Sequence, residues 1–113
     1  MQSSRLEKLL EFIKNEPEDE FLKYALATEY LRLNETDKAL EYYEDLVNNH
    51  PGYVGTYYHL GKLYEALNRK EDAIATYEKG MKAAREKRDN HALSELQAVY
   101  NELAGIEDDD DDY

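Results

Sequence analysis

Cysteine is absent from this 113-residue chain, and proline and glycine are scarce, with two and five residues respectively. The lack of cysteine excludes disulfides, iron–sulfur clusters, cysteine-ligated zinc and catalysis by a thiol. Few prolines and glycines favour helices over a turn-rich β-sandwich. Because 42% of the residues are hydrophobic, the chain is too apolar for general disorder. Its length fits a single domain.

Positive charge and long apolar runs are also in short supply. Fourteen lysines and arginines face 26 acidic residues, which gives a net charge of −12. A surface of that sign repels nucleic acid phosphates and anionic lipids, so neither nucleic acid nor a membrane is an expected partner. No run approaches the roughly 18 apolar residues of a membrane-spanning helix, and charges interrupt the amino terminus as no signal-peptide core would allow. We therefore expect a soluble, cytoplasmic protein.

The most informative pattern is a repeat with a period of 34 residues, which separates Pro17 from Pro51. The same offset pairs identical residues elsewhere: Tyr24 with Tyr58, Leu26 with Leu60, Tyr30 with Tyr64, Asn34 with Asn68, Ala39 with Ala73 and Tyr43 with Tyr77. A fixed period of this length is typical of architectures built by stacking one structural unit. The chain therefore holds two copies of one unit.

Within each copy, apolar residues recur at helical spacing on both sides of a polar break. The first copy has Leu26, Tyr30 and Leu33 before the break, and Ala39, Leu40, Tyr43, Leu46 and Val47 after it. The second copy has Leu60, Leu63, Tyr64 and Leu67 before the break, and Ala73, Ile74, Tyr77 and Met81 after it. Each copy is predicted to be a hairpin of two antiparallel helices that stacks on a neighbour to bury its apolar stripe.

These residues resemble the tetratricopeptide repeat, a 34-residue helical hairpin with characteristic small and aromatic positions. The matching residues are Leu26, Ala27, Tyr30, Ala39, Tyr43 and Pro51 in the first copy, and Tyr57, Leu60, Gly61, Tyr64, Ala73, Tyr77 and Gly80 in the second. Lys23, Leu46 and Arg85 depart from the pattern. The resemblance implies an all-α, right-handed α-solenoid that binds peptides along the concave surface formed by the first helix of each repeat.

The pattern extends to both ends and predicts about six helices in one domain over residues 1–106. We expect a capping helix at 4–16, repeats at 17–50 and 51–86, and a closing helix at 88–105. Residues 107–113 carry six carboxylates, half of the net charge, and their mutual repulsion predicts a disordered acidic tail. Three roles stay open for this tail: solvation, a weak contact with a divalent ion or basic partner, and autoinhibition over Lys62 and residues 82–88.

The candidate peptide-binding groove lies on the face of each first helix opposite the packing stripe. Its predicted residues are Phe21, Tyr24, Thr28 and Leu31 in the first copy, and Tyr58, His59, Lys62 and Glu65 in the second. In an alternative interpretation, Phe21 and Tyr24 pack beneath the amino-terminal helix. Lys62 is the one fixed cation of the set, and Glu65 is placed at i+3 to neutralise it. A mainly apolar or mildly basic ligand is therefore expected.

Patterns for catalysis and metal binding are missing from the sequence. His91 and Glu95 lie one helical turn apart, but two ligands do not complete a metal site. The sequence has neither a nucleophile elbow nor a glycine-rich phosphate cradle. We therefore expect a non-catalytic interaction module that takes a protein or peptide partner and needs no cofactor or metal. The alternative is a self-assembling structural homodimer joined through its end helices.

Overall fold

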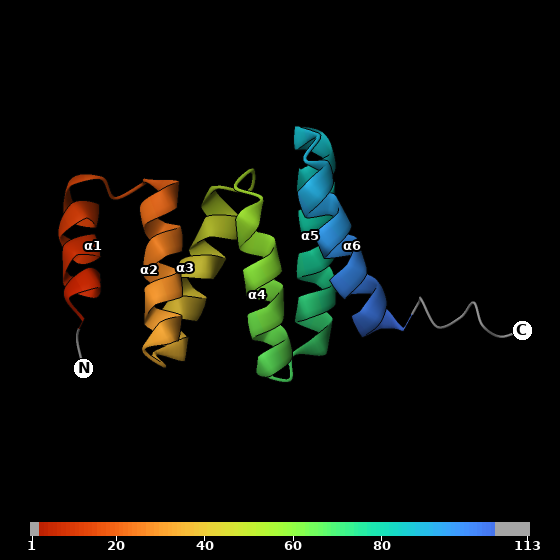
Figure 1. Cartoon of the computed structure of the whole chain (residues 1–113), viewed down its shortest axis with the longest axis horizontal. Helices are drawn as coiled ribbons and strands as arrows, with labels where there is room; N and C mark the ends of the chain where they lie inside the picture. The colour runs from red at the N-terminus through yellow and green to blue at the C-terminus, as the bar shows by residue number, and fades with distance from the viewer. Residues whose placement is uncertain (1–2, 106–113) are drawn as a thin grey trace, which may run out of the picture. The chain divides into compact units, whose positions relative to one another are not determined.

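A computed structural model describes residues 3–105 of the chain, and the acidic tail predicted at 107–113 lies outside them. Residues 3–105 form six helices and contain no strand, and Figure 1 labels the helices in chain order. The helices are α1 (Ser4–Asn15), α2 (Glu20–Arg32), α3 (Thr36–Asn49), α4 (Gly55–Ala66), α5 (Lys70–Lys87) and α6 (Asn90–Ala104). The predicted all-α repeat fold is confirmed.

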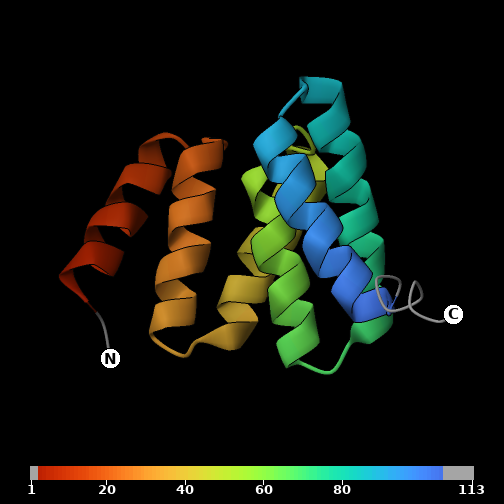
Figure 2. The same ribbon diagram turned by 45° about the vertical axis from the view of Figure 1, so that its right-hand side comes forward.

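The helices group into two compact units, one ending at Tyr53 and the other beginning at Val54. In the first unit α2 packs against both α1 and α3, and Figure 2 shows α1 alongside α2. Its buried side chains include Leu6, Leu9, Leu26, Ala27, Ala39, Tyr43 and Leu46. The small side chains let α2 and α3 approach closely while tyrosine and leucine fill the space around the contact. The single domain and the repeat bounds expected above stay predictions.

The second unit is formed by α4, α5 and α6, with α6 packed against both other helices. Two glycines set its close contacts. A Cβ atom on Gly61 of α4 would lie 2.1 Å from Cε1 of Tyr77, and one on Gly80 of α5 would lie 2.5 Å from Cβ of Tyr57. Both tyrosines are buried, so their side chains occupy the space that a larger residue at either glycine needs.

The turn in each hairpin has the same backbone conformation, which explains why asparagine recurs there at the 34-residue offset. Asn34 and Asn68 adopt left-handed backbone conformations, with φ of 64° and 61°, and asparagine tolerates this region better than most residues. The N–H of the following residue then donates to the carbonyl of Tyr30 or Tyr64 at 2.8 Å. Leu67, which was predicted in the packing stripe, is 39% exposed because it is the C-cap residue where α4 ends. That part of the predicted stripe is wrong.

Candidate functional site

The α2 face, defined as Phe21, Tyr24, Thr28 and Leu31, lies in the first unit. Phe21 is 60% exposed, Thr28 is exposed, and Tyr24 and Leu31 are half-buried. Phe21 is therefore not buried beneath the amino-terminal helix, which was the alternative interpretation. The helix places these side chains one after another because they recur at i, i+3 or i+4.

Tyr24 is supported by other tyrosines of the first unit. Its ring centroid lies 6.3 Å from that of Tyr43 on α3 and 5.7 Å from that of Tyr53, in the turn after α3. Burial raises the pKa of both Tyr24 and Tyr43. Thr28 Oγ1 lies 3.2 Å from the Tyr43 hydroxyl and also donates to the Tyr24 carbonyl at 3.0 Å. Tyr24 is thus an aromatic ring held in one position, with part of its surface open to solvent.

The α4 face, defined as Tyr58, His59, Lys62 and Glu65, lies in the second unit. The rings of Tyr58 and His59 meet edge to face, with centroids 5.5 Å apart. Partial desolvation lowers the pKa of His59, a shift that nearby Glu95 opposes, so the surroundings of the imidazole favour its neutral form. Lys62 Nζ lies 3.9 Å from Glu65 Oε2, which confirms the predicted pairing of these two charges.

A buried tyrosine also holds Glu65. The hydroxyl of Tyr77, which is fully buried on α5, donates to Glu65 Oε2 at 2.6 Å. Burial and this hydrogen bond together raise the pKa of Tyr77. Tyr43 makes the corresponding approach to Thr28 in the first unit. In both units, therefore, a core tyrosine from the second helix fixes a side chain of the candidate face, an arrangement that the sequence pattern did not predict.

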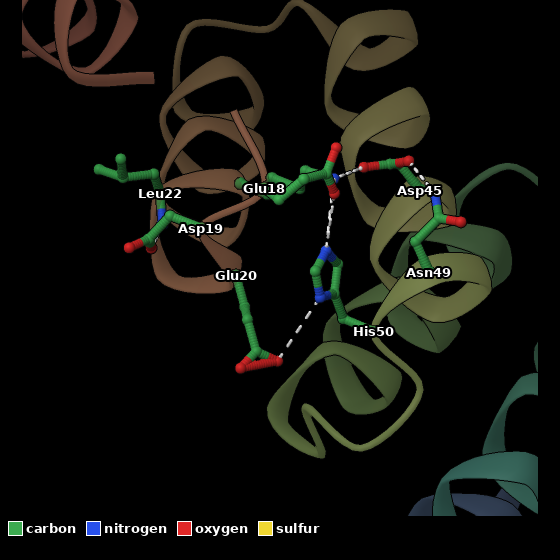
Figure 3. A network of polar contacts seen from close by, with 8 residues as sticks. Glu18, Asp19, Glu20, Leu22, Asp45, Asn49 and His50 are labelled. Atoms are coloured by element: carbon green, nitrogen blue, oxygen red, sulfur yellow. Dashed lines mark hydrogen bonds and ion pairs between the residues drawn. The ribbon is translucent and has the colours of Figure 1, made fainter. Parts of the chain in front are cut away.

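Lys23, which departed from the repeat pattern, is the centre of a polar network in the first unit. It is 5% exposed, and its Nζ lies 2.5 Å from Asp45 Oδ2 and 2.9 Å from Glu18 Oε1. The side chains of Glu18, Asp45 and His50 come together in Figure 3. His50 Nε2 lies 3.3 Å from Glu18 Oε1. Burial alone lowers the pKa of Lys23, but hydrogen bonds to Asp45 and Glu18 outweigh it and raise the pKa overall.

A second buried charge, Glu29 on α2, ties α1 to α2. Its side chain is 3% exposed and lies 2.5 Å from Arg32, 3.5 Å from Arg5 and 2.8 Å from the Ser3 hydroxyl that donates to it. Hydrogen bonds from Arg32 and Ser3 lower the pKa of Glu29 to about 2. Both networks join residues of the first unit and hold its helices together, and none of their residues belongs to the α2 face.

The structure places the predicted site residues in two sets, one on each first helix. Within each set the side chains are neighbours, and a common groove formed by both sets stays a prediction. His91 Nε2 lies 3.2 Å from Glu95 Oε2, but no group of three histidine or acidic side chains in residues 3–105 is placed to hold a metal. No helix in the described range has the length and apolar character needed to cross a membrane.

Comparison with solved structures shows close relatives of this fold. A tetratricopeptide repeat domain protein from Salinibacter ruber, studied by solution NMR, is 51% identical, and the match covers 80% of this chain and 91% of that chain with a TM-score of 0.76. A crystal structure of a tetratricopeptide repeat domain protein from the same organism is 50% identical, covering 79% and 99%, with a TM-score of 0.74. A protein from Bordetella parapertussis is 25% identical, covering 92% and 90%, with a TM-score of 0.75.

The family comparison agrees with these structural matches. No curated protein matches the chain, but the family model described as tetratricopeptide repeat matches residues 24–87, which include the whole of α3, α4 and α5 and most of α2. Repeats of this kind generally mediate protein–protein interactions. One assignment follows from the 34-residue period, the paired asparagine turns, the close contacts at small residues and these matches. The chain belongs to the tetratricopeptide repeat family.

Proposed function

We propose that this chain is a non-catalytic protein-interaction module whose α2 and α4 faces bind a peptide or helical segment of a partner protein. The observation that carries the proposal is that a buried tyrosine fixes part of each face. Tyr43 contacts Tyr24 and Thr28 of the α2 face, and Tyr77 donates to Glu65 of the α4 face. Side chains fixed before binding lose little conformational freedom when a ligand arrives. Membership of a family that generally mediates protein–protein interactions adds support.

The chemistry of the two faces points to a mainly apolar ligand. Tyr24, Leu31 and Tyr58 offer apolar surface to ligand side chains, as aromatic anchors do in other interfaces. Thr28, His59 and Lys62 offer polar contacts that fix the register. Because Lys62 is paired with Glu65, the α4 face carries no strong net charge and favours a ligand with few charges of its own.

A random 12-residue peptide display library, selected against the whole chain, tests the proposal. Enriched peptides are then titrated by calorimetry against the wild type and against two variants, Thr28→Arg on the α2 face and Lys62→Glu on the α4 face. Lys79→Glu, an exposed position on α5, is the matched control. We expect each face variant to weaken binding at least about tenfold, equivalent to about 1.4 kcal/mol, and the control to leave it within about twofold.

Circular dichroism of each variant establishes that the helices are intact. If the enriched peptides bind the wild type and both face variants equally well, the faces are not the binding surface and the proposal is wrong. A loss that is equally large in Lys79→Glu also contradicts it, because the effect then follows overall charge rather than position.

Self-association is a second candidate function, supported by the partly open surface of α6. Among the α6 side chains, all of which lie in the described range, Leu96 alone is buried, while Leu93, Val99 and Leu103 are half-buried. Two copies that pair through these residues bury an apolar strip that a single copy leaves exposed in part. Sedimentation equilibrium tests this candidate: a dimer that Val99→Asp converts to a monomer supports it, and a wild-type monomer at 100 micromolar contradicts it.

A further inference from the structure

The chain's two phenylalanines share an unusual position. Phe12 on α1 is 57% exposed and Phe21 on α2 is 60% exposed. Both line a single hollow of about 370 Å³, where α1 ends and α2 begins. The other lining residues are Asn15, Glu16, Asp19 and Leu22. We call this surface the Phe12–Phe21 hollow.

The walls of the hollow are fixed by two helix ends. Glu16 is the C-cap residue of α1, and its N–H donates to the Phe12 carbonyl at 3.2 Å. Asp19 is the N-cap residue of α2, where its side chain accepts from the N–H of Leu22 at 2.9 Å. The packing of α1 on α2 is provided by Leu6 and Leu9, which are buried. The phenylalanines are therefore not needed to close the core, and their exposed rings are available to a ligand.

The lining also has a definite charge. Glu16 and Asp19 contribute two carboxylates, and none of the six lining residues is a lysine or an arginine. A segment of complementary charge carries lysine or arginine beside an apolar group. An arginine guanidinium also stacks favourably on an aromatic ring. Charge thus selects among the candidate occupants of the hollow.

Two other occupants fit this charge poorly. The acidic tail at residues 107–113 carries six carboxylates, which the acidic rim repels. A second copy docked through the same hollow brings two sets of Glu16 and Asp19 together, and like charges at close range oppose such pairing.

From these observations we infer that the Phe12–Phe21 hollow binds a basic peptide segment in which one apolar side chain is flanked by arginine or lysine. The hollow shares Phe21 with the α2 face, but the inference goes beyond the proposed function, because Phe12, Glu16 and Asp19 belong to neither face and the expected ligand is basic.

Three labelled heptapeptides test this inference by fluorescence anisotropy at 150 mM salt with the full chain. The first has leucine at its centre and arginine elsewhere, the second replaces the leucine by glycine, and the third replaces the arginines by glutamate. We expect saturable binding of the first peptide, at least tenfold weaker binding of the second and no binding of the third. The Phe12→Ala/Phe21→Ala double variant is expected to weaken the first complex at least tenfold.

Matched variants separate the hollow from general charge. Leu67→Ala removes a different exposed apolar side chain, 39% exposed and in the second unit, and is expected to leave affinity within twofold. Asp19→Asn keeps an N-cap acceptor for Leu22 and removes one charge, so it is expected to weaken binding without unfolding α2. Both phenylalanines are exposed, so their replacement is expected to leave the fold intact, which circular dichroism checks. Because Phe21 also belongs to the α2 face, the single Phe12→Ala variant isolates the hollow and is expected to weaken the first complex as well.

Several outcomes overturn the inference. Equal affinity for the leucine and glycine peptides means that the chain attracts arginine by charge alone. Unchanged affinity in the double phenylalanine variant places the peptide elsewhere. A peptide-free dimer that the same variant abolishes makes a second copy the occupant. Loss of library-peptide binding in Lys62→Glu, by contrast, concerns the α4 face and leaves this result unaffected.

Discussion

The contact between Gly61 and Tyr77 allows one substitution to be analysed quantitatively. Replacing Gly61 by alanine places a Cβ atom 2.1 Å from Cε1 and 2.6 Å from Cζ of Tyr77. The Tyr77 ring is fully buried, so it cannot swing into solvent to make room. It must shift within the core, and its hydroxyl then leaves its position 2.6 Å from Glu65 Oε2.

The expected cost follows from three contributions. Alanine in a helix interior is favoured over glycine by about 1 kcal/mol. Overpacking a well-filled core costs about 1–3 kcal/mol, and a hydrogen bond to a charged group contributes about 1.5–3 kcal/mol. Together these effects predict that Gly61→Ala lowers the free energy of unfolding by roughly 1.5–5 kcal/mol. Helix propensity alone predicts instead that Gly61→Ala raises the free energy of unfolding.

Urea unfolding followed by circular dichroism measures the effect, with two matched comparisons. Gly55→Ala adds the same methyl group at the start of α4, where nothing lies within 4 Å of the new atom, and is expected not to destabilise the chain. Tyr77→Leu removes the ring, so Gly61→Ala introduced into that background is expected to lose most of its penalty. The resulting coupling energy is expected to exceed about 1 kcal/mol, within the range of about 0.5–3 kcal/mol for residues in direct contact.

The reasoning is refuted if Gly61→Ala is as stable as the wild type. It is also refuted if the penalty is the same with tyrosine or leucine at position 77, because the clash is then not the cause. The first unit shows that a Cβ atom is not forbidden at this point of the repeat: Ala27 stands 34 positions before Gly61 and is fully buried. In the first unit, the hydroxyl of the equivalent tyrosine, Tyr43, lies next to Thr28, whereas that of Tyr77 donates to Glu65. The two tyrosines therefore have different hydrogen-bond partners.

Three further predictions concern the Glu29 ion pairs, the C-cap of α5 and the Lys23–Asp45 pair. Because hydrogen bonding, chiefly with Arg32, lowers the pKa of Glu29 from 4.5 to about 2, its ionised form stabilises the fold at neutral pH, and this contribution is lost as pH falls from about 4.5 toward 2. Urea titrations should show the wild type losing stability more steeply than Glu29→Gln over that range, and equal slopes contradict this. Arg88 ends α5 with φ of 57°, so Arg88→Gly is expected to stabilise the chain by about 0.5–1 kcal/mol, whereas a lower melting temperature contradicts it. Asp45→Ala should destabilise the chain more than Lys23→Leu. The first change leaves the buried Lys23 ammonium with one partner fewer, whereas the second leaves the accessible Asp45 carboxylate without its partner. A larger loss of melting temperature in Lys23→Leu than in Asp45→Ala contradicts this prediction.

The fold was predictable because its determinants repeat along the chain. Identical tyrosines and alanines at one offset fix the helical faces, and the recurring pair Asn34 and Asn68 marks the left-handed turn in each hairpin. Leu67 shows the limit of the method, because helical spacing continues an apolar stripe past the point where the helix ends. The backbone conformation at Asn68 decides that end, and the apolar pattern does not record it.

The candidate site was predictable only in part. Periodicity assigns Tyr24, Thr28 and Lys62 to a helix face, but it cannot show which side chains from another helix reach that face. The hydrogen bond from Tyr77 to Glu65 depends on the direction of a buried ring. Lys23 was visible as a charge at an apolar position, but its pairing with Asp45 requires knowing how α2 and α3 align.

Amide chemical-shift mapping with the most enriched library peptide tests the central claim most directly. If the chain binds partners through the first helix of each repeat, peptide addition should shift amide resonances on α2 around Tyr24 and Thr28 and on α4 around Tyr58 and Lys62, and leave those of exposed α5 residues such as Lys79 unchanged. Shifts confined to α5 and α6, with α2 and α4 unaffected at saturating peptide, would contradict the claim.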